Sequence, residues 1–123
     1  MSFFRNKITT FQSIFLATAL LISSSNALAH VKLLSAIPAI NATVTAQPKN
    51  LILNFGEDVM LMNIKLSDAQ QNNISLNYKV SHDLKKSFNI ATPNLNKGKY
   101  TVSWSTMGKD GHNMNGEYSF IYK

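Results

Sequence analysis

Short runs of alternating apolar and polar residues, repeated at intervals of roughly ten residues, constrain the fold of this chain most strongly. In the clearest run, residues 51–55, the side chains of Leu51, Leu53 and Phe55 would share one face of a strand. Residues 100–104 and 118–122 repeat the pattern with aromatic side chains. No segment shows a helical period of useful length. The pattern therefore predicts an all-β sandwich or small Greek-key barrel of about seven strands.

The strand boundaries follow from the turn-forming residues between the runs. Gly56-Glu57-Asp58 is expected to end the strand 51–55. Pro38, Pro48 and Pro93 fall in other predicted turns, because proline cannot donate to a strand ladder. We expect strands at residues 31–35, 43–45, 51–55, 60–66, 74–80, 86–91, 99–105 and 116–122.

Residues 1–29 have the three parts of a cleavable secretory signal peptide. Arg5 and Lys7 form a basic start, residues 11–22 are mostly apolar, and Ala27-Leu28-Ala29 is an A-x-A cleavage pattern. The apolar run is shorter than the roughly 20 residues that span a bilayer as a helix, so we expect no stable membrane insertion of the mature chain. The expected mature protein is one domain, residues 30–123, exported to the periplasm.

Cleavage at this position would make His30 the first residue. A free α-amine has an unperturbed pKa of about 7.7–8.0, so it loses its proton far more easily than a lysine side chain. The amine and the ring Nδ1 of His30 can then close a chelate ring on one metal ion. One residue would supply two nitrogen ligands.

A second candidate for metal binding is the polar turn Lys109–Gly116, which lies between two predicted strands. Asp110 and His112 stand two residues apart, so both side chains can lean to the same side of an extended or bulged backbone. Two ligands are too few for a tight site, and His30 would complete a shell of four nitrogen and oxygen ligands. The alternative is that Asp110-Gly111 is simply a favoured hairpin turn.

Two further groups have open interpretations. Glu57 is either a solvated carboxylate at the rim or an additional group that binds the metal or orients its ligands. Met60 and Met62 would share a strand face, and thioethers suit Cu(I). Methionines at such spacing more often pack the core or fill gaps.

Composition excludes several classes of function. The chain has no cysteine, which rules out thiolate metal sites and disulfides. The formal charge is +6, and after loss of Arg5 and Lys7 it would be +4, carried by scattered lysines. No arginine follows residue 5, although arginine is the usual residue for bidentate recognition of phosphate and bases. We therefore expect no nucleic-acid partner.

Four segments together carry a resemblance to a known family, and they span nearly the whole mature chain. They are residues 30–38, residues 51–57, residues 95–104 and residues 110–120. In these segments the chain resembles the periplasmic copper-resistance protein C (CopC) family. The resemblance implies an Ig-like or cupredoxin-like Greek-key fold that binds copper outside the cytoplasm.

The resemblance implies a Cu(II) site made by the N-terminal amine and ring of His30 with Asp110 and His112, and with Glu57 nearby. Such nitrogen and oxygen ligands suit Cu(II). We expect a protein that sequesters or carries copper without catalysing a reaction, with an inner-membrane copper transporter of the same pathway as a partner. The resemblance does not extend to the methionine-rich segment with a histidine that Cu(I)-binding members carry, since His82 stands in no such run.

Two alternatives belong to other classes. An N-terminal histidine with a second histidine also resembles the copper-binding histidine brace of oxidative polysaccharide monooxygenases. The other alternative is an Ig-like interaction module without a metal. Release of oxidised sugars would favour the first, and a null copper titration of correctly processed protein would favour the second.

Overall fold

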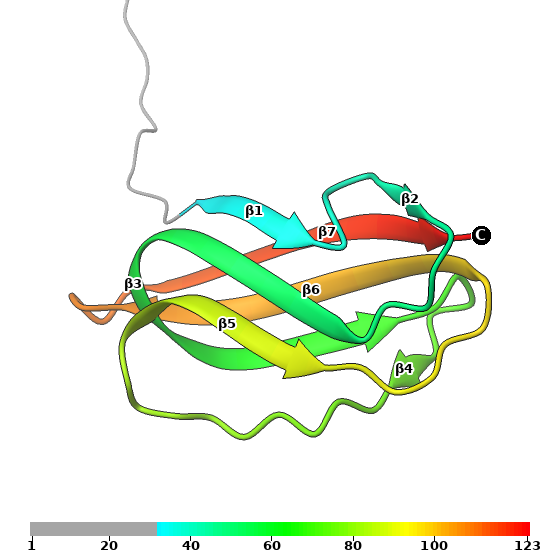
Figure 1. Ribbon diagram of the computed structural model, residues 1–123. Helices are drawn as coiled ribbons and strands as arrows, with labels where there is room; N and C mark the ends of the chain where they lie inside the picture. The colour runs from blue at the N-terminus through cyan, green and yellow to red at the C-terminus, as the bar shows by residue number, and fades with distance from the viewer. Residues whose placement is uncertain (1–31) are drawn as a thin grey trace, which may run out of the picture. The chain divides into compact units, whose positions relative to one another are not determined.

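The computed structural model describes residues 32–123, and its regular structure consists of seven strands (Figure 1). They are β1 (Leu33–Ile37), β2 (Thr43–Val44), β3 (Asn50–Ser67), β4 (Asn73–Ile74), β5 (Lys85–Ala91), β6 (Gly98–Gly108) and β7 (Asn113–Tyr122). No helix in this part of the chain has the length and apolar character needed to cross a membrane. The all-β prediction with about seven strands is confirmed.

The strands form one curled, mixed sheet in the order β1-β3-β6-β7-β2, with β4 and β5 also paired to β3. β3 is the strand that connects the two halves. Its first part pairs with β1 on one edge and β5 on the other, and its second part pairs with β6. All of these pairs are antiparallel, whereas β2 lies parallel to β7. In Figure 1 the ribbon of β3 turns at one end of the molecule, where it passes from one half to the other.

The prediction that Gly56-Glu57-Asp58 ends a strand is wrong. β3 continues through these residues because both sides of the bend are held by neighbouring chain: the Gly56 N–H donates to the carbonyl oxygen of Lys32 (3.0 Å), and Val59 pairs with Gly108 of β6. Tertiary pairing here outweighs the local turn preference of glycine and aspartate. The bend brings the start of β1 and the end of β6 to the same end of the molecule.

The core lies between the two halves of the curled sheet. Leu51, Leu53 and Phe55 are buried on β3 as the alternation predicted, and Tyr100 and Val102 are buried on β6. Phe55 meets Trp104 of the facing half at a centroid distance of 6.0 Å. All seven strands and the hydrophobic core lie within residues 32–123, so a chain that begins at His30 contains the complete fold.

The predicted strand 74–80 is wrong beyond its first residue, because β4 ends at Ile74. The alternation is nevertheless real, since Leu76 and Tyr78 are partly buried against the core while their neighbours are exposed. The segment meets β3 through a side chain: the Tyr78 hydroxyl donates to the carbonyl oxygen of Leu61 (2.6 Å). The alternating pattern therefore reports burial, and here burial occurs without a strand ladder.

Candidate metal centre

The turn between β6 and β7 brings Asp110 and His112 together. The Gly108 N–H donates to the His112 carbonyl oxygen (3.0 Å), and the Gly111 N–H donates to the Gly108 carbonyl oxygen (3.0 Å). Gly111 has a φ of 83°, a left-handed conformation that residues with a Cβ rarely adopt. These backbone constraints turn both side chains to one side of the hairpin, as the spacing of two residues predicted.

Asp110 and His112 are in direct contact. The Nδ1 atom of His112 lies 2.7 Å from Oδ2 of Asp110, and the His112 backbone N–H donates to Oδ1 of the same carboxylate (3.1 Å). Both side chains remain open to solvent, with exposed fractions of 80% for His112 and 67% for Asp110. The hydrogen bonds from the His112 side chain and backbone hold the pKa of Asp110 below its ordinary value. The carboxylate therefore stays ionised and available to a cation.

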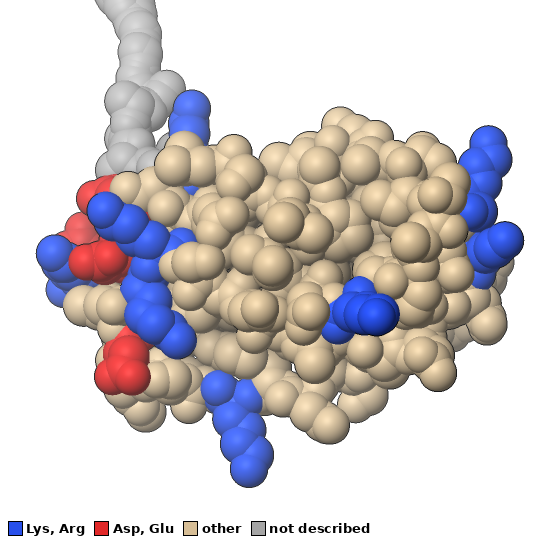
Figure 2. Space-filling model, in the orientation of Figure 1, with Lys and Arg blue, Asp and Glu red and all other residues tan. Residues whose placement is uncertain are grey.

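Glu57 lies at the same end of the molecule. The last pair of the β3–β6 ladder is Val59 with Gly108, and Glu57 and Asp110 each stand two residues beyond it. Figure 2 shows acidic side chains gathered at this end, where Figure 1 places the bend of β3 and the β6–β7 turn. Within residues 32–123 no hydrogen bond or ion pair joins Glu57 to Asp110 or His112. Its place is that of a neighbouring carboxylate.

The described residues supply only part of a metal shell. No group of three or more His, Cys, Asp or Glu side chains suited to one ion occurs among them. The third predicted ligand, His30, lies outside the described residues, as does the predicted signal peptide 1–29. The described chain starts at Lys32, whose carbonyl oxygen accepts the hydrogen bond from Gly56 at the bend of β3. His82, the other histidine of this part of the chain, is exposed in the segment after β4, as expected of a surface residue.

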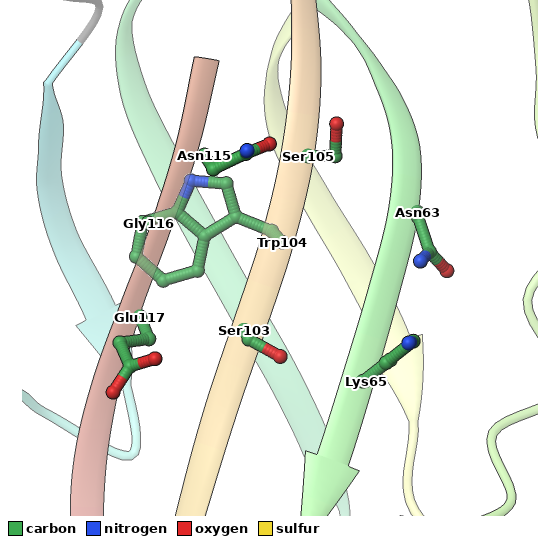
Figure 3. Close-up of a pocket in the computed structure, with 8 residues that line it drawn as sticks. All are labelled: Asn63, Lys65, Ser103, Trp104, Ser105, Asn115, Gly116 and Glu117. Atoms are coloured by element: carbon green, nitrogen blue, oxygen red, sulfur yellow. The ribbon is translucent and has the colours of Figure 1, made fainter.

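A groove that the sequence analysis did not identify lies on the β3–β6–β7 face (Figure 3). Its volume is about 440 Å³. Trp104 and Gly116 form part of its lining, and Lys65 of β3 and Glu117 of β7 stand on opposite sides of β6. The remaining lining residues are polar: Asn63, Ser103, Ser105 and Asn115. The signal for it is the alternation of polar residues in three neighbouring strands, which becomes visible only once their register is known.

Comparison with known proteins identifies the family. The model of the CopC domain family matches residues 33–123, which is nearly all of the described chain. The chain belongs to the CopC family. Protein YobA of Escherichia coli K12 is 34% identical over 99 residues, covering 77% of this chain and 80% of that protein. Copper resistance protein C of Escherichia coli is 29% identical over 111 residues, covering 80% and 85%.

Solved structures of the CopC family share the fold. The crystal structure of CopC from Methylosinus trichosporium OB3b is 27% identical with a TM-score of 0.65, covering 76% of this chain and 94% of that chain. PcoC, described as a methionine-rich copper resistance protein from Escherichia coli, is 28% identical with a TM-score of 0.63, covering 77% and 100%. The resemblance that the sequence motifs predicted is thus confirmed over the whole described domain.

Proposed function

We propose that this CopC-family chain is an exported copper-binding protein that holds Cu(II) with His30, Asp110 and His112 and serves copper resistance or homeostasis in the periplasm. The observation that carries the proposal is the contact between Asp110 and His112 at 2.7 Å. The role is binding and delivery, with no reaction catalysed. Glu57 is the accessory carboxylate of this site.

The geometry of the pair suits a divalent transition metal. Two ligand atoms with metal bonds of about 2.0–2.1 Å at right angles lie about 2.8–3.0 Å apart. The separation of 2.7 Å between Nδ1 and Oδ2 is close to this value, so an ion can replace the shared proton with little movement of either side chain. Because the two side chains are already held by the turn, little conformational entropy is lost on binding.

The missing nitrogen ligands are expected from the start of the mature chain. The backbone of Lys32 is anchored at Gly56 in the bend of β3, at the end of the molecule that carries the β6–β7 turn. Two residues of extended chain reach about 7 Å. His30 stands two residues before Lys32, so this anchor limits how far its amine and ring can be from the turn.

Net charge also favours a cation at this end. The chain as a whole is basic, yet acidic side chains gather around the bend of β3 and the β6–β7 turn (Figure 2). Local negative charge lowers the cost of bringing a divalent ion to the surface of a basic protein. Of the divalent ions, Cu(II) binds such nitrogen and oxygen sites most tightly.

A titration of Cu(II) into protein that begins at His30 tests the site. We expect His112→Ala to weaken binding at least about tenfold, because disturbing even a group that orients a ligand costs that much. Glu57→Gln should have a smaller effect. His82→Ala is the matched control, since His82 is exposed in a different segment, and it should bind as the unchanged protein does.

The pH dependence gives a second test. Nitrogen ligands must lose their protons to bind a metal, so Cu(II) binding should be weaker at pH 5 than at pH 7.5. Equal affinity at both pH values, or equal binding by the His112→Ala and His82→Ala variants, would contradict nitrogen ligation at the turn. Absence of any Cu(II) binding would favour the metal-free interaction module, and reductant-dependent release of oxidised sugars would favour the oxidative enzyme.

A further inference from the structure

Three methionines lie together on the outer face of β3 and β6. Met60 of β3 is the direct cross-strand partner of Met107 of β6. Cross-strand partners have Cβ atoms about 4.5–5.5 Å apart and project from the same face of the sheet. Their neighbours Leu61 and Thr106 are paired on the opposite face and are almost fully buried, so Met60 and Met107 face outward.

Met62 joins this pair because of a bulge. The β3–β6 register shifts between Leu61 and Asn63, which leaves Met62 as the extra residue on β3. Leu61 and Ile64 on either side of this step are buried, whereas Met62 is half-buried and Asn63 is exposed. A bulge sets two consecutive side chains on one face, and here Met62 and Asn63 occupy the outer face together. Met62 therefore projects from the same side as Met60.

These methionines do not serve as core packing. Met60, Met62 and Met107 are each half-buried. The partly buried residues that pack against the core of the described domain are Leu33, Val44, Ile74, Leu76, Tyr78, Trp104 and Tyr122, a set that contains none of the three methionines. The common explanation for methionines at alternate strand positions, which the sequence favoured, is therefore missing here.

We propose that Met60, Met62 and Met107 form a thioether site for a soft monovalent ion, Cu(I). Thioether sulfur is a soft ligand that selects Cu(I) over harder ions. Each methionine has three rotatable bonds, so side chains that start about 5–7 Å apart on a sheet face can converge on one ion. The site lies on strand residues, and residues 63–106 contain no methionine. It does not depend on the Cu(II) site proposed above.

Silver(I) is a suitable probe because it is a soft monovalent ion that is not oxidised in air. We would label the methionine methyl groups with ¹³C in protein that begins at His30, and follow their resonances during titration with Ag(I). The methyl signals of Met60, Met62 and Met107 should shift together. Met114 is the internal control, because it pairs with the buried Thr106 on the other face and should not follow them.

Substitution then tests the ligand set. Met107→Leu should lower the Ag(I) affinity at least about tenfold, as disturbance of a metal site does. Met114→Leu should leave the affinity unchanged. Exchange of methionine for leucine nearly conserves volume and usually costs less than about 1.5 kcal/mol, so both variants are expected to fold, and thermal melting checks this. Cu(I) kept reduced by ascorbate should give the same methyl pattern as Ag(I).

Each outcome separates this site from the Cu(II) site. His112→Ala should abolish tight Cu(II) binding and leave the Ag(I) shifts in place, so loss of one site does not decide the other. Equal shifts of all four methyl groups, equal affinities of Met107→Leu and Met114→Leu, or a pattern produced by Ag(I) but not by Cu(I) would each overturn the proposal.

Discussion

Gly116 is the position where adding a single methyl group should be most damaging. It pairs with Trp104 across β6 and β7, and a Cβ atom at residue 116 would lie 2.5 Å from Cζ2 and 2.8 Å from Cε2 of the indole ring. Carbon atoms in favourable contact are about 3.5–4.0 Å apart, so the ring must move by roughly 1 Å. Gly116→Ala therefore forces Trp104 out of its present position.

The cost follows from what surrounds the indole. Trp104 meets Phe55 edge-on at 6.0 Å and Tyr118 at 6.1 Å. If the ring moves away it loses these aromatic contacts, each worth about 0.5–1.5 kcal/mol, and if it stays the crowding costs about 1–3 kcal/mol. Both routes give a loss of about 1–3 kcal/mol in the free energy of unfolding. For a domain of this size that corresponds to a fall in Tm of roughly 4–20 °C.

Thermal unfolding followed by tryptophan fluorescence is the appropriate assay, because Trp104 is the only tryptophan in the chain. Gly56→Ala is the matched control. A Cβ at residue 56 would meet its nearest atoms, in Leu34, at an ordinary contact distance of 3.7 Å, so its effect should stay within about 1 kcal/mol. Equal melting temperatures for the two variants would refute the argument that Trp104 requires glycine opposite it.

Three further predictions concern stability. Gly111→Ala should destabilise the β6–β7 turn by about 1–2 kcal/mol, since φ at this residue is 83°, and chemical denaturation would measure the loss. Asn54→Ala removes a hydrogen-bonded bridge from β3 to serine hydroxyls of β1 and β5 (2.9 and 2.7 Å) and should cost about 0.5–1.5 kcal/mol in the same assay. Burial raises the pKa of Tyr78 and of Tyr100 in the folded state, so their contribution to stability is complete below about pH 10 and is lost as pH rises through the folded pKa values. Spectrophotometric titration of tyrosinate should accordingly show ionisation above pH 10 together with loss of structure, and ionisation near pH 10 without unfolding would contradict this.

The fold class could be predicted from sequence because alternation is a local signal. The buried positions Leu51, Leu53 and Phe55, and the aromatic residues Tyr118 and Phe120, follow directly from it. The extent of β3 could not be predicted in this way. Its continuation past Gly56 depends on a hydrogen bond to Lys32 and on pairing with β6, and neither partner is near in sequence.

The segment after β4 shows the opposite error. Leu76 and Tyr78 alternate with exposed residues as in a strand, yet the backbone has no ladder, and the hydroxyl of Tyr78 bonds to β3 instead. Periodicity tells which side chains are buried, whereas hydrogen-bonded pairing depends on what lies alongside.

The candidate site divides in the same way. The convergence of Asp110 and His112 was predictable because two residues of one turn determine it, and the structure places their side chains in contact. The register that sets Met107 opposite Met60 was not predictable, since 47 positions of sequence separate them and the bulge at Met62 follows from the pairing itself. Ligands within one turn can be identified from sequence, and ligands joined by register require the sheet.

The central claim is that a processed N-terminal His30 completes a Cu(II) site with Asp110 and His112. The most direct test is electron paramagnetic resonance of one equivalent of Cu(II) added to protein that begins at His30, compared with protein that carries one extra residue before it. The extra residue keeps the imidazole and displaces the free α-amine. We predict distinct spectra, with fewer nitrogen ligands and weaker binding in the extended protein; identical spectra and affinities would contradict the account.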